Sequence, residues 1–398
     1  MGKLEINIFG LEKKKTDFLM FLDKYSQLNS SQYTIIPAFI DVHVHFREPG
    51  FVYKETILTG SKAAAKGGYT TVFTMPNLNP VSDTVEHIQE QLNIIKQDAV
   101  INVLPYGSIT INQEGKQISP LTETANLVIA FSDDGKGVQK DNLMKEAMLK
   151  AKALDKVIVA HCEDNTLING GYIHDGQYAK EHNHKGICSA SEYEQVKRDI
   201  ELVRETGCKY HVCHVSTKES VDLIRKAKKD GLDITCETAP HYLILNDSML
   251  KEDGCFKINP PIRSKQDQEA LIKGVQDGTI DMIATDHAPH AESEKNKGLK
   301  DSAFGASGIE IAFPLLYTYL VKKNIITMDK LLDLLVNNPR KRFNLPDNND
   351  FAIWDLNAKV KIDPNTFISM GHNTPFKGYE VCGVNQLTVC NRKVVYKK

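Results

Sequence analysis

Residues 34–46, TIIPAFIDVHVHF, form an apolar run that ends in two histidines, His43 and His45. Continuous Val, Ile, Ala and Phe content is typical of a strand that is buried on both faces. Side chains two residues apart on a strand point to the same face, so both imidazoles are expected on one side. The run passes at once into the turn-like stretch 47–50. In a parallel barrel the active site lies at the carboxyl ends of the strands, so this run indicates a metal-dependent hydrolase.

Seven further runs of the same kind follow along the chain, at 69–77, 99–109, 127–134, 156–164, 209–217, 232–241 and 280–290. Between them lie segments with helical periodicity, and several of these end in glycine, as helices often do. Alternating strands and helices predict parallel βα units, and eight units predict a TIM-like (β/α)8 barrel. Residues 309–324 and 328–343 predict two more helices after the eighth strand.

The two ends of the chain have a different pattern. The N-terminal part holds a strand-like run, 4–10, and a helical one, 13–28, whereas the C-terminal part holds short strands separated by turn signals. We therefore predict a small β-rich appendage built from residues 1–33 and 350–398, beside a catalytic barrel of residues 34–349.

Composition and charge limit the classes of function. The chain has 398 residues, 41% of them hydrophobic and 25% charged, and a formal net charge of −2. This balance gives no reason to expect nucleic acid or a membrane surface as a partner. The eight cysteines show no CxxC pairing, which favours a reduced, cytoplasmic setting over a disulfide framework. No apolar run reaches membrane-spanning length.

Ligand-type side chains end four of the other strands as well: Asp133 and Asp134, His161, His214, and Asp286 followed by His290. Any one of these is weak on its own, but their common position at the mouth of one barrel is a strong joint signal. Imidazole nitrogen and carboxylate oxygen suit zinc or a similar divalent metal. With one such residue from each of these four strand ends and two from the first, four histidines and two aspartates are too many for one tetrahedral ion, so we infer a binuclear site with one bridging carboxylate.

The motifs around these residues resemble those of the dihydroorotases, in the bacterial class I branch of the amidohydrolase superfamily. The matching stretches are HVHFREPG (43–50), GGYTT and MPN (67–77), FSDDG (131–135), AHCED (160–164), HVCHVST (211–217), KINPPIR (257–263) and ATDHAPH (284–290). They stand in order over roughly residues 35–345, and the NTPF-G run at 373–378 resembles the tail of that family.

The resemblance implies two zinc ions per chain, held by His43, His45, Asp134, His161, His214 and Asp286. It places His43, His45 and Asp286 on one ion and the other two histidines on the second. Many relatives bridge the ions with a carboxylated lysine, but here the fourth strand ends in Asp133 and Asp134, and the resemblance favours Asp134 as the bridge.

The resemblance also implies a substrate and a reaction: reversible interconversion of (S)-dihydroorotate and N-carbamoyl-L-aspartate in de novo pyrimidine biosynthesis. Arg47, Asn77 and His290 would hold the substrate carboxylate, and His45, Asn259, Phe304 and Gly305 would complete the substrate site. An arginine suits this task because its planar fork matches a carboxylate. Asp286 would be the catalytic residue that takes up and returns the proton.

Two alternatives and several further expectations remain. One alternative is another cyclic amidase, an allantoinase or hydantoinase, although such relatives typically lack an arginine at the position of Arg47. The other is a non-catalytic subunit that supports a carbamoyltransferase, although such proteins lose metal ligands. The resemblance further implies a homodimer and allows a carbamoyltransferase partner. Ala38 replaces a glycine that is usual in the family. His211, three residues from His214, is expected to face the helices, and His241 and His287 to serve packing.

Overall fold

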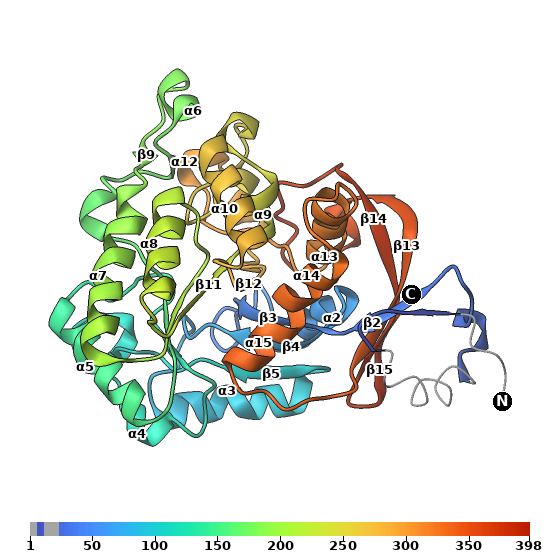
Figure 1. The fold of residues 1–398 in the computed structure, drawn as a ribbon, viewed down its shortest axis with the longest axis horizontal. Helices are drawn as coiled ribbons and strands as arrows, with labels where there is room; N and C mark the ends of the chain where they lie inside the picture. The colour runs from blue at the N-terminus through green and yellow to red at the C-terminus, as the bar shows by residue number, and fades with distance from the viewer. Residues whose placement is uncertain (1–5, 12–23) are drawn as a thin grey trace.

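The computed structural model describes residues 6–11 and 24–398. Within them, short parallel strands lie at the centre of the molecule and helices lie outside (Figure 1). The eight central strands are β3 (Phe39–Val44), β4 (Tyr69–Thr74), β5 (Asn102–Pro105), β6 (Phe131–Ser132), β7 (Ile158–Ala160), β10 (Tyr210–Val212), β11 (Ile234–Thr238) and β12 (Met282–Ile283). Each lies inside one of the eight predicted runs, so the predicted strands are confirmed.

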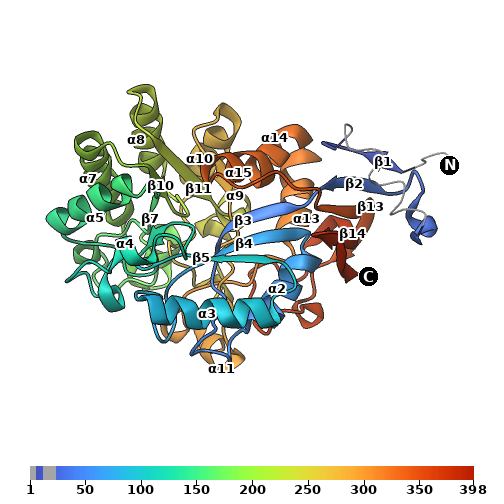
Figure 2. The ribbon, with the colours of Figure 1, turned by 90° about the horizontal axis from the view of Figure 1, so that it is seen from below.

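The central strands close into a ring. Hydrogen bonds join them in two parallel sheets, β3-β4-β5 and β6-β7-β10-β11-β12, of which the first is seen from below in Figure 2. Isolated bridges connect the sheets at Gly107 with Phe131 and at Val44 with His287. At the second bridge the amide of His45 donates to the carbonyl of His287 at 2.8 Å. All strands therefore direct their carboxyl ends to one side, where a barrel carries its site.

Helices cover the ring from the outside: α2 (Ile57–Lys66), α3 (Val85–Asp98), α4 (Leu121–Thr124), α5 (Asp141–Ala153), α7 (Ala190–Thr206), α8 (Lys218–Lys229) and α10 (Lys265–Asp277). Thr56 and Ser264 begin α2 and α10 with capping boxes, which satisfy free N–H groups of the first turn. Gly207 and Gly278 end α7 and α10 with φ of 65° and 83°, a conformation that favours glycine. The short α4 was not predicted.

The two helices predicted after the eighth strand are present, but each contains a π-helical turn. The first is α13 (Ala312–Leu316) continued by η7 (Tyr317–Val321). The second consists of α14 (Met328–Leu332), η8 (Asp333–Asn337) and α15 (Asn338–Arg342). Pro339 is the second residue after η8, in the first turn of α15, and a proline there lacks the N–H that a continuous α-helix would use. The wider turn accommodates this interruption without ending the helix.

A cluster of buried side chains from the strands and the residues next to them fills the ring, while a larger one packs the strands against the helices. Phe73, Met75 and Val159 belong to the inner cluster, and Phe343, which follows α15, contacts Phe73 edge-on with ring centroids 4.9 Å apart. Burial on both faces accounts for the nearly continuous apolar runs in the sequence.

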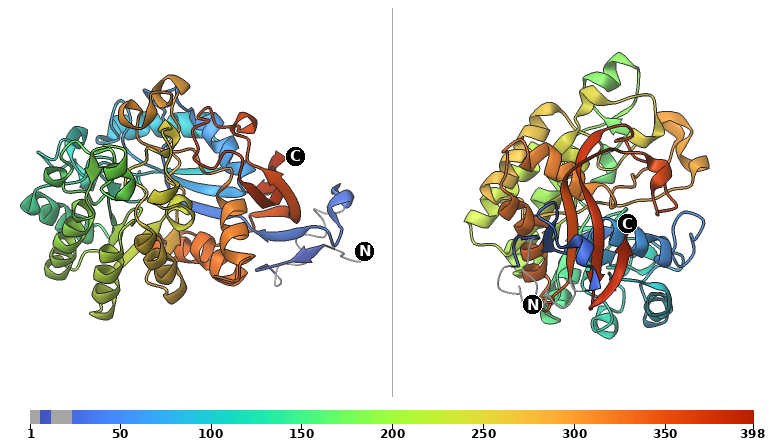
Figure 3. Two further views of the ribbon diagram at one scale, coloured as in Figure 1. Left: turned by 90° about the horizontal axis from the view of Figure 1, so that it is seen from above. Right: turned by 90° about the vertical axis from the view of Figure 1, so that its right-hand side faces the viewer.

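Both ends of the chain form a second sheet beside the barrel (Figure 3). Its order is β1 (Asn7–Ile8), β2 (Thr34–Pro37), β13 (Phe351–Lys361), β14 (Glu380–Cys390) and β15 (Lys393–Lys397). Trp354 of β13 packs against Phe313 at 4.5 Å between ring centroids and so joins the sheet to the barrel helices. The predicted terminal β-rich portion is confirmed. The division at residues 34 and 349 stays a prediction, and most of the predicted helix 13–28 lies outside the described residues.

The first predicted strand, 34–46, is in fact two strands that belong to different sheets. β2 pairs with β13, and β3 pairs with β4. The change of partner occurs at Ala38, whose amide donates to Asp350 O at 3.1 Å, while the next amide, of Phe39, donates to Gly68 O at 2.9 Å. Ala38 has no positive φ, so the alanine fits where the family usually has glycine.

Shorter elements lie in the loops. They are β8 (Ile173–His174), β9 (Gly186–Ile187), α6 (Gln177–Glu181), α9 (Pro240–Ile244), α11 (Glu292–Lys295) and α12 (Gly298–Asp301), with 3-10 turns η2 (Ser26–Leu28), η3 (Ile111–Gln113), η4 (Asn165–Leu167), η5 (Asp247–Met249), η6 (Gly254–Phe256) and η9 (Pro364–Thr366). Among the described residues, every helix is too short or too polar to cross a bilayer.

Candidate active site

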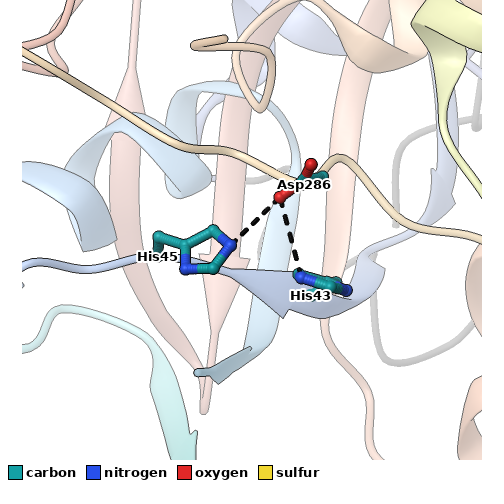
Figure 4. Close-up of side chains that lie close together, drawn as sticks. All are labelled: His43, His45 and Asp286. Atoms are coloured by element: carbon teal, nitrogen blue, oxygen red, sulfur yellow. Dashed lines mark hydrogen bonds and ion pairs between the residues drawn. The ribbon is translucent and has the colours of Figure 1, made fainter. Parts of the chain in front are cut away.

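Two histidines of the first barrel strand meet an aspartate that follows the eighth. His43 lies in β3 and His45 directly after it, and both turn toward Asp286, as Figure 4 shows. His45 Nε2 lies 3.1 Å from Asp286 Oδ1, and His43 Nε2 lies 3.6 Å from the same oxygen. Asp286 has a φ of 47°, so the chain turns sharply where β12 ends. Closure of the strand ring thus brings the residues at the end of the first barrel strand next to the residue that follows the eighth.

The carboxylate of Asp134, after β6, lies among four imidazoles. Its Oδ2 is 3.5 Å from His43 Nε2 and 3.4 Å from His45 Nε2. Its Oδ1 is 3.3 Å from His214 Nε2 and 3.5 Å from His161 Nδ1. All of these side chains are buried. The structure therefore brings together the six side chains that the sequence analysis selected as metal ligands.

Asp133, the other carboxylate at this strand end, faces away from the histidines. Its Oδ1 accepts hydrogen bonds from Ser108 Oγ at 2.8 Å and from the amides of Ile109 at 2.8 Å and Thr110 at 3.1 Å. These bonds hold the loop after β5. Of the two candidate bridging carboxylates, only Asp134 is directed to the imidazoles.

The carboxylates and imidazoles of the cluster stabilise each other's charged forms. Burial alone would raise the pKa of Asp134, but His43 and hydrogen bonds from His161 and His214 hold this pKa well below its usual value. Burial opposes a proton on His43, yet Asp134 and Glu237 raise the pKa of His43 well above its usual value. A carboxylate surrounded by imidazoles is thus strongly favoured in its ionised form.

The donor set of the cluster fits divalent metal. Within the described part of the chain, the buried Nε2 atoms of His43 and His161 have no hydrogen-bond partner. Donor atoms of His43, His45 and Asp286, and likewise those of His43, Asp134 and His214, lie within 4.8 Å of one another. Buried polar atoms normally have partners, and ions ligated by imidazole and carboxylate would supply them here.

Another carboxylate beside the histidines, that of Glu237 in β11, was not selected from the sequence. Its Oε1 lies 2.6 Å from His43 Nδ1, and its Oε2 lies 3.0 Å from His211 Nε2. Burial would raise the pKa of Glu237, but the two histidines lower it to about 2. An ionised Glu237 directs Nδ1–H of His43 toward itself and leaves Nε2 facing Asp134 and Asp286. Carboxylates in this position orient a metal-binding histidine.

The prediction that His211 faces the helices is wrong. Its ring lies in the barrel interior, bonded to Glu237 and 5.9 Å from the Phe343 ring. His241 is buried beside the site, where burial lowers its pKa to about 4. His287 accepts a hydrogen bond from the amide of Gly308 at 3.2 Å.

We expect Glu237→Gln to weaken metal binding about 10- to 100-fold, as loss of a partner behind a ligand typically does. Glutamine keeps the size of the side chain but removes the charge that orients His43. Titration with a competing chelator measures the change. Glu310→Gln is the matched control, since Glu310 is also a buried carboxylate but accepts hydrogen bonds from the amides of Ile368 and Ser369, outside the cluster. Equal metal affinity in native protein and Glu237→Gln would refute the orienting role.

A cavity of about 190 Å³ opens beside the six-residue cluster. Its lining includes all the side chains predicted to bind substrate, namely His45, Arg47, Asn77, Asn259, His290, Phe304 and Gly305. Asp134, His161, His214 and Asp286 line it as well. His43 is not part of the lining, because it is fully buried beneath.

Arg47 is the buried cation of the cavity wall. Its Nε donates to Pro289 O at 3.3 Å, and its Nη2 lies 3.4 Å from His290 Nε2. No carboxylate among the described residues lies within ion-pair distance of its guanidinium. Burial lowers the pKa of Arg47 to about 10, which still leaves it charged at neutral pH. A buried, charged and unpaired arginine calls for an anionic ligand.

The rest of the wall is fixed by local hydrogen bonds. Asn77 Oδ1 lies 3.0 Å from His45 Nδ1, so this amide touches both the cavity and a candidate ligand. Asn259 Nδ2 donates to Glu163 Oε2 at 3.2 Å. His290 Nε2 donates to Phe304 O at 2.8 Å, which joins the two loops that follow β12.

A parallel barrel whose strand ends present this histidine–aspartate cluster is a metal-dependent hydrolase of the amidohydrolase class. A family model described as dihydro-orotase-like matches residues 33–220. The chain is 50% identical over 370 residues to a dihydroorotase of Fusobacterium nucleatum, covering 91% of this chain and 87% of that relative. A dihydroorotase of a Geobacillus species is also 50% identical, over 92% of this chain and 87% of its own length. The chain belongs to the dihydroorotase family.

Solved structures confirm the predicted barrel fold. An L-hydantoinase (dihydropyrimidinase) from Arthrobacter aurescens superposes with a TM-score of 0.82 at 26% identity, covering 92% of this chain and 86% of its own. A dihydropyrimidinase from Brevibacillus agri NCHU1002 gives a TM-score of 0.79 at 20% identity over 92% of this chain and 85% of its own. At these identities the similarity establishes the fold and leaves the substrate to the residues of the cavity.

Proposed function

We propose that this chain catalyses the reversible hydrolysis of dihydroorotate to N-carbamoyl-L-aspartate, with the cluster of histidines and aspartates as its metal centre. The observation that carries the choice of substrate is Arg47, buried in the cavity wall without a carboxylate partner among the described residues. Dihydroorotate brings one carboxylate and one cyclic amide, which match the arginine and the metal cluster that line the same small cavity. Relatives named dihydroorotase, 50% identical, support the same choice.

The substrate-binding residues position the ring. The guanidinium of Arg47 is placed to form two parallel hydrogen bonds with the substrate carboxylate. Asn77 and His290 line the same cavity and supply further polar contacts. With the carboxylate held, the ring amide lies toward Asp286 and the histidines. Holding the reacting carbon in this orientation supplies a large share of the catalysis in such a site.

Asp286 is the proposed acid–base group. It lines the cavity and lies 3.1 Å from His45. Burial would raise the pKa of Asp286, but hydrogen bonding to His45 and the charge of His43 lower it to about 2. The ionised carboxylate accepts the proton of the attacking water. It then donates that proton to the ring nitrogen as the carbon–nitrogen bond breaks.

The metal centre is proposed to hold two zinc ions. His43, His45 and Asp286 would bind one ion, His161 and His214 the other, and Asp134 both. When bound, such ions lower the pKa of a water molecule and polarise the carbonyl that it attacks. The chemistry of the donor atoms supports zinc, since imidazole and carboxylate are ligands that zinc commonly takes.

Replacement of Asp134 by alanine is expected to reduce metal content from about two ions per chain to one or fewer, because a bridging carboxylate offsets the repulsion between two cations. Metal analysis after dialysis measures this directly. Asp133→Ala is the matched control, since the neighbouring carboxylate bonds only to the loop after β5. Two ions retained in Asp134→Ala would exclude the bridging role.

Two alternative functions make different predictions for the native protein. A hydantoinase or allantoinase would hydrolyse an uncharged ring faster than dihydroorotate. A non-catalytic subunit would bind no metal and would hydrolyse neither dihydroorotate nor an uncharged ring. Against this alternative, all six candidate ligands are present in this chain. One assay of dihydroorotate, hydantoin and allantoin, with metal analysis on the same sample, separates the three functions. The homodimer, a carbamoyltransferase partner and a cytoplasmic location stay predictions.

A further inference from the structure

A segment of the terminal portion, far from the barrel strands in sequence, lies against the cavity wall. Residues 368–374, here named the C-terminal brace, follow η9 and precede β14. Glu310 Oε1 accepts the amides of Ile368 at 2.8 Å and Ser369 at 3.0 Å. Glu55 accepts the hydroxyl of Ser369 and the amide of Met370, the latter at 3.3 Å. Two buried carboxylates of the barrel thus hold the start of the brace in place.

The middle of the brace touches the loop that carries His290. A Cβ added to Gly371 would lie 2.5 Å from Pro289 Cβ and 2.7 Å from Pro289 Cα. Contacts this short cannot exist in a packed protein, so only glycine allows the brace to approach Pro289 so closely. Pro289 is also the residue whose carbonyl accepts the hydrogen bond from Arg47 Nε.

Asn373, near the end of the brace, forms hydrogen bonds with both loops of the cavity wall. Its Oδ1 accepts the amide of His290 at 3.1 Å and the hydroxyl of Ser307 at 3.1 Å. Its Nδ2 donates to Ala288 O at 3.3 Å and to Gly305 O at 3.0 Å. The side chain is buried, so these groups have no water to replace it.

The groups that Asn373 holds are those that shape the carboxylate-binding side of the cavity. His290 and Gly305 line it, and Arg47 is bonded to the segment between Ala288 and His290. The ammonium of Lys295 holds Gly305 O from another side at 2.8 Å. The amide of Asn373 therefore ties together two wall loops that are also joined by His290 Nε2 with Phe304 O and by Ala288 N with Ala306 O, whereas none of the six candidate metal ligands is bonded to it.

We propose that Asn373 is a positioning residue for the substrate carboxylate, acting through His290, Gly305 and the Pro289 carbonyl that holds Arg47. This inference rests on the proposed function. Loss of the amide would remove four hydrogen bonds from the two wall loops and let the segment from Ala288 to His290 shift, so that the arginine would no longer face the carboxylate squarely. The metal cluster would keep its geometry. The consequence is weaker substrate binding with a smaller effect on the chemical step.

The test compares Asn373→Ala with Asn385→Ala in the native, metal-loaded protein. Asn385 is a matched control: it is also buried, belongs to the terminal sheet, and donates to barrel carbonyls, of Ala65 at 3.3 Å and Lys66 at 2.9 Å. Both variants are expected to lower Tm. Only Asn373→Ala is expected to raise KM for dihydroorotate, by about 10-fold or more, because small displacements at a site are costly.

Two further readouts separate positioning from stability. The Ki of orotate, a planar ring with the same carboxylate, should rise with KM in Asn373→Ala, while metal content stays native. Gly371→Ala should raise KM as well, since it displaces the brace from Pro289 without touching the amide. If Asn373→Ala does not fold, Gly371→Ala still tests the positioning role.

The outcomes are distinguishable. A native protein that does not act on dihydroorotate refutes the proposed function. An active native protein whose folded Asn373→Ala and Gly371→Ala variants keep the native KM and orotate Ki refutes the positioning role alone. An equal rise of KM in Asn385→Ala would also refute it, because the effect would then follow from lost stability.

Discussion

Asp286→Asn is expected to lower kcat for dihydroorotate by about 10²- to 10⁴-fold, the usual cost of losing a general base. Asparagine has nearly the same shape, but its amide cannot accept the proton that the carboxylate takes up. KM should change little, because the carboxylate of the substrate is held by Arg47 and not by Asp286. Steady-state kinetics and metal analysis of one preparation measure both quantities.

Asp199→Asn is the matched control for this variant. Asp199 is a fully buried carboxylate of α7, paired with Arg198 at 2.7 Å and outside the cavity lining. Its loss should lower Tm and leave kcat close to native. If Asp286→Asn kept most of its turnover with metal bound, another group would have to carry the proton.

Arg47→Met is expected to raise KM for dihydroorotate and lower kcat/KM by about 10²-fold or more, because it leaves the substrate carboxylate without its buried partner. Metal content should be unchanged, since no candidate ligand is bonded to Arg47. Arg47→Lys should recover only part of the loss, as it restores the charge but not the planar fork. Kinetics with dihydroorotate and with hydantoin give the comparison.

Arg263→Met controls for the loss of a buried arginine. Its guanidinium donates to Ser216 Oγ at 3.1 Å and Ile187 O at 2.9 Å, and it is not among the cavity-lining residues. Its KM should remain near native. Native protein that hydrolysed hydantoin faster than dihydroorotate would overturn the substrate assignment, while the barrel and the metal cluster would stand.

The barrel strands could be predicted because each is a short apolar run ending in a chemically distinctive residue. The division at Ala38 could not be predicted, since β2 and β3 form one apolar stretch and only tertiary pairing separates them. The π turns η7 and η8 were missed for a similar reason: a helical pattern of apolar residues does not report a local change in the number of residues per turn.

Strand alternation placed His43 and His45 correctly but failed for His211. The argument assumed that the strand continues regularly from His211 to His214. His214 has a φ of 29°, so the backbone leaves the extended conformation and both side chains reach the interior. Glu237 was missed because it lies within its strand and not at the end of the run 232–241, where His241 is the ligand-type residue. Asn373 lies in no strand of the barrel, and only the folded chain brings it to the wall.

The bridge between Val44 and His287 places the last closure of the ring at the metal cluster itself. His45 and Asp286 are 241 positions apart in the chain. During synthesis on the ribosome, the first two histidines emerge long before the aspartate that completes their set, and such distant contacts form late in folding. The set of His43, His45 and Asp286 is therefore assembled only in a chain whose barrel has closed, and the nascent chain cannot complete this set before its eighth strand is made.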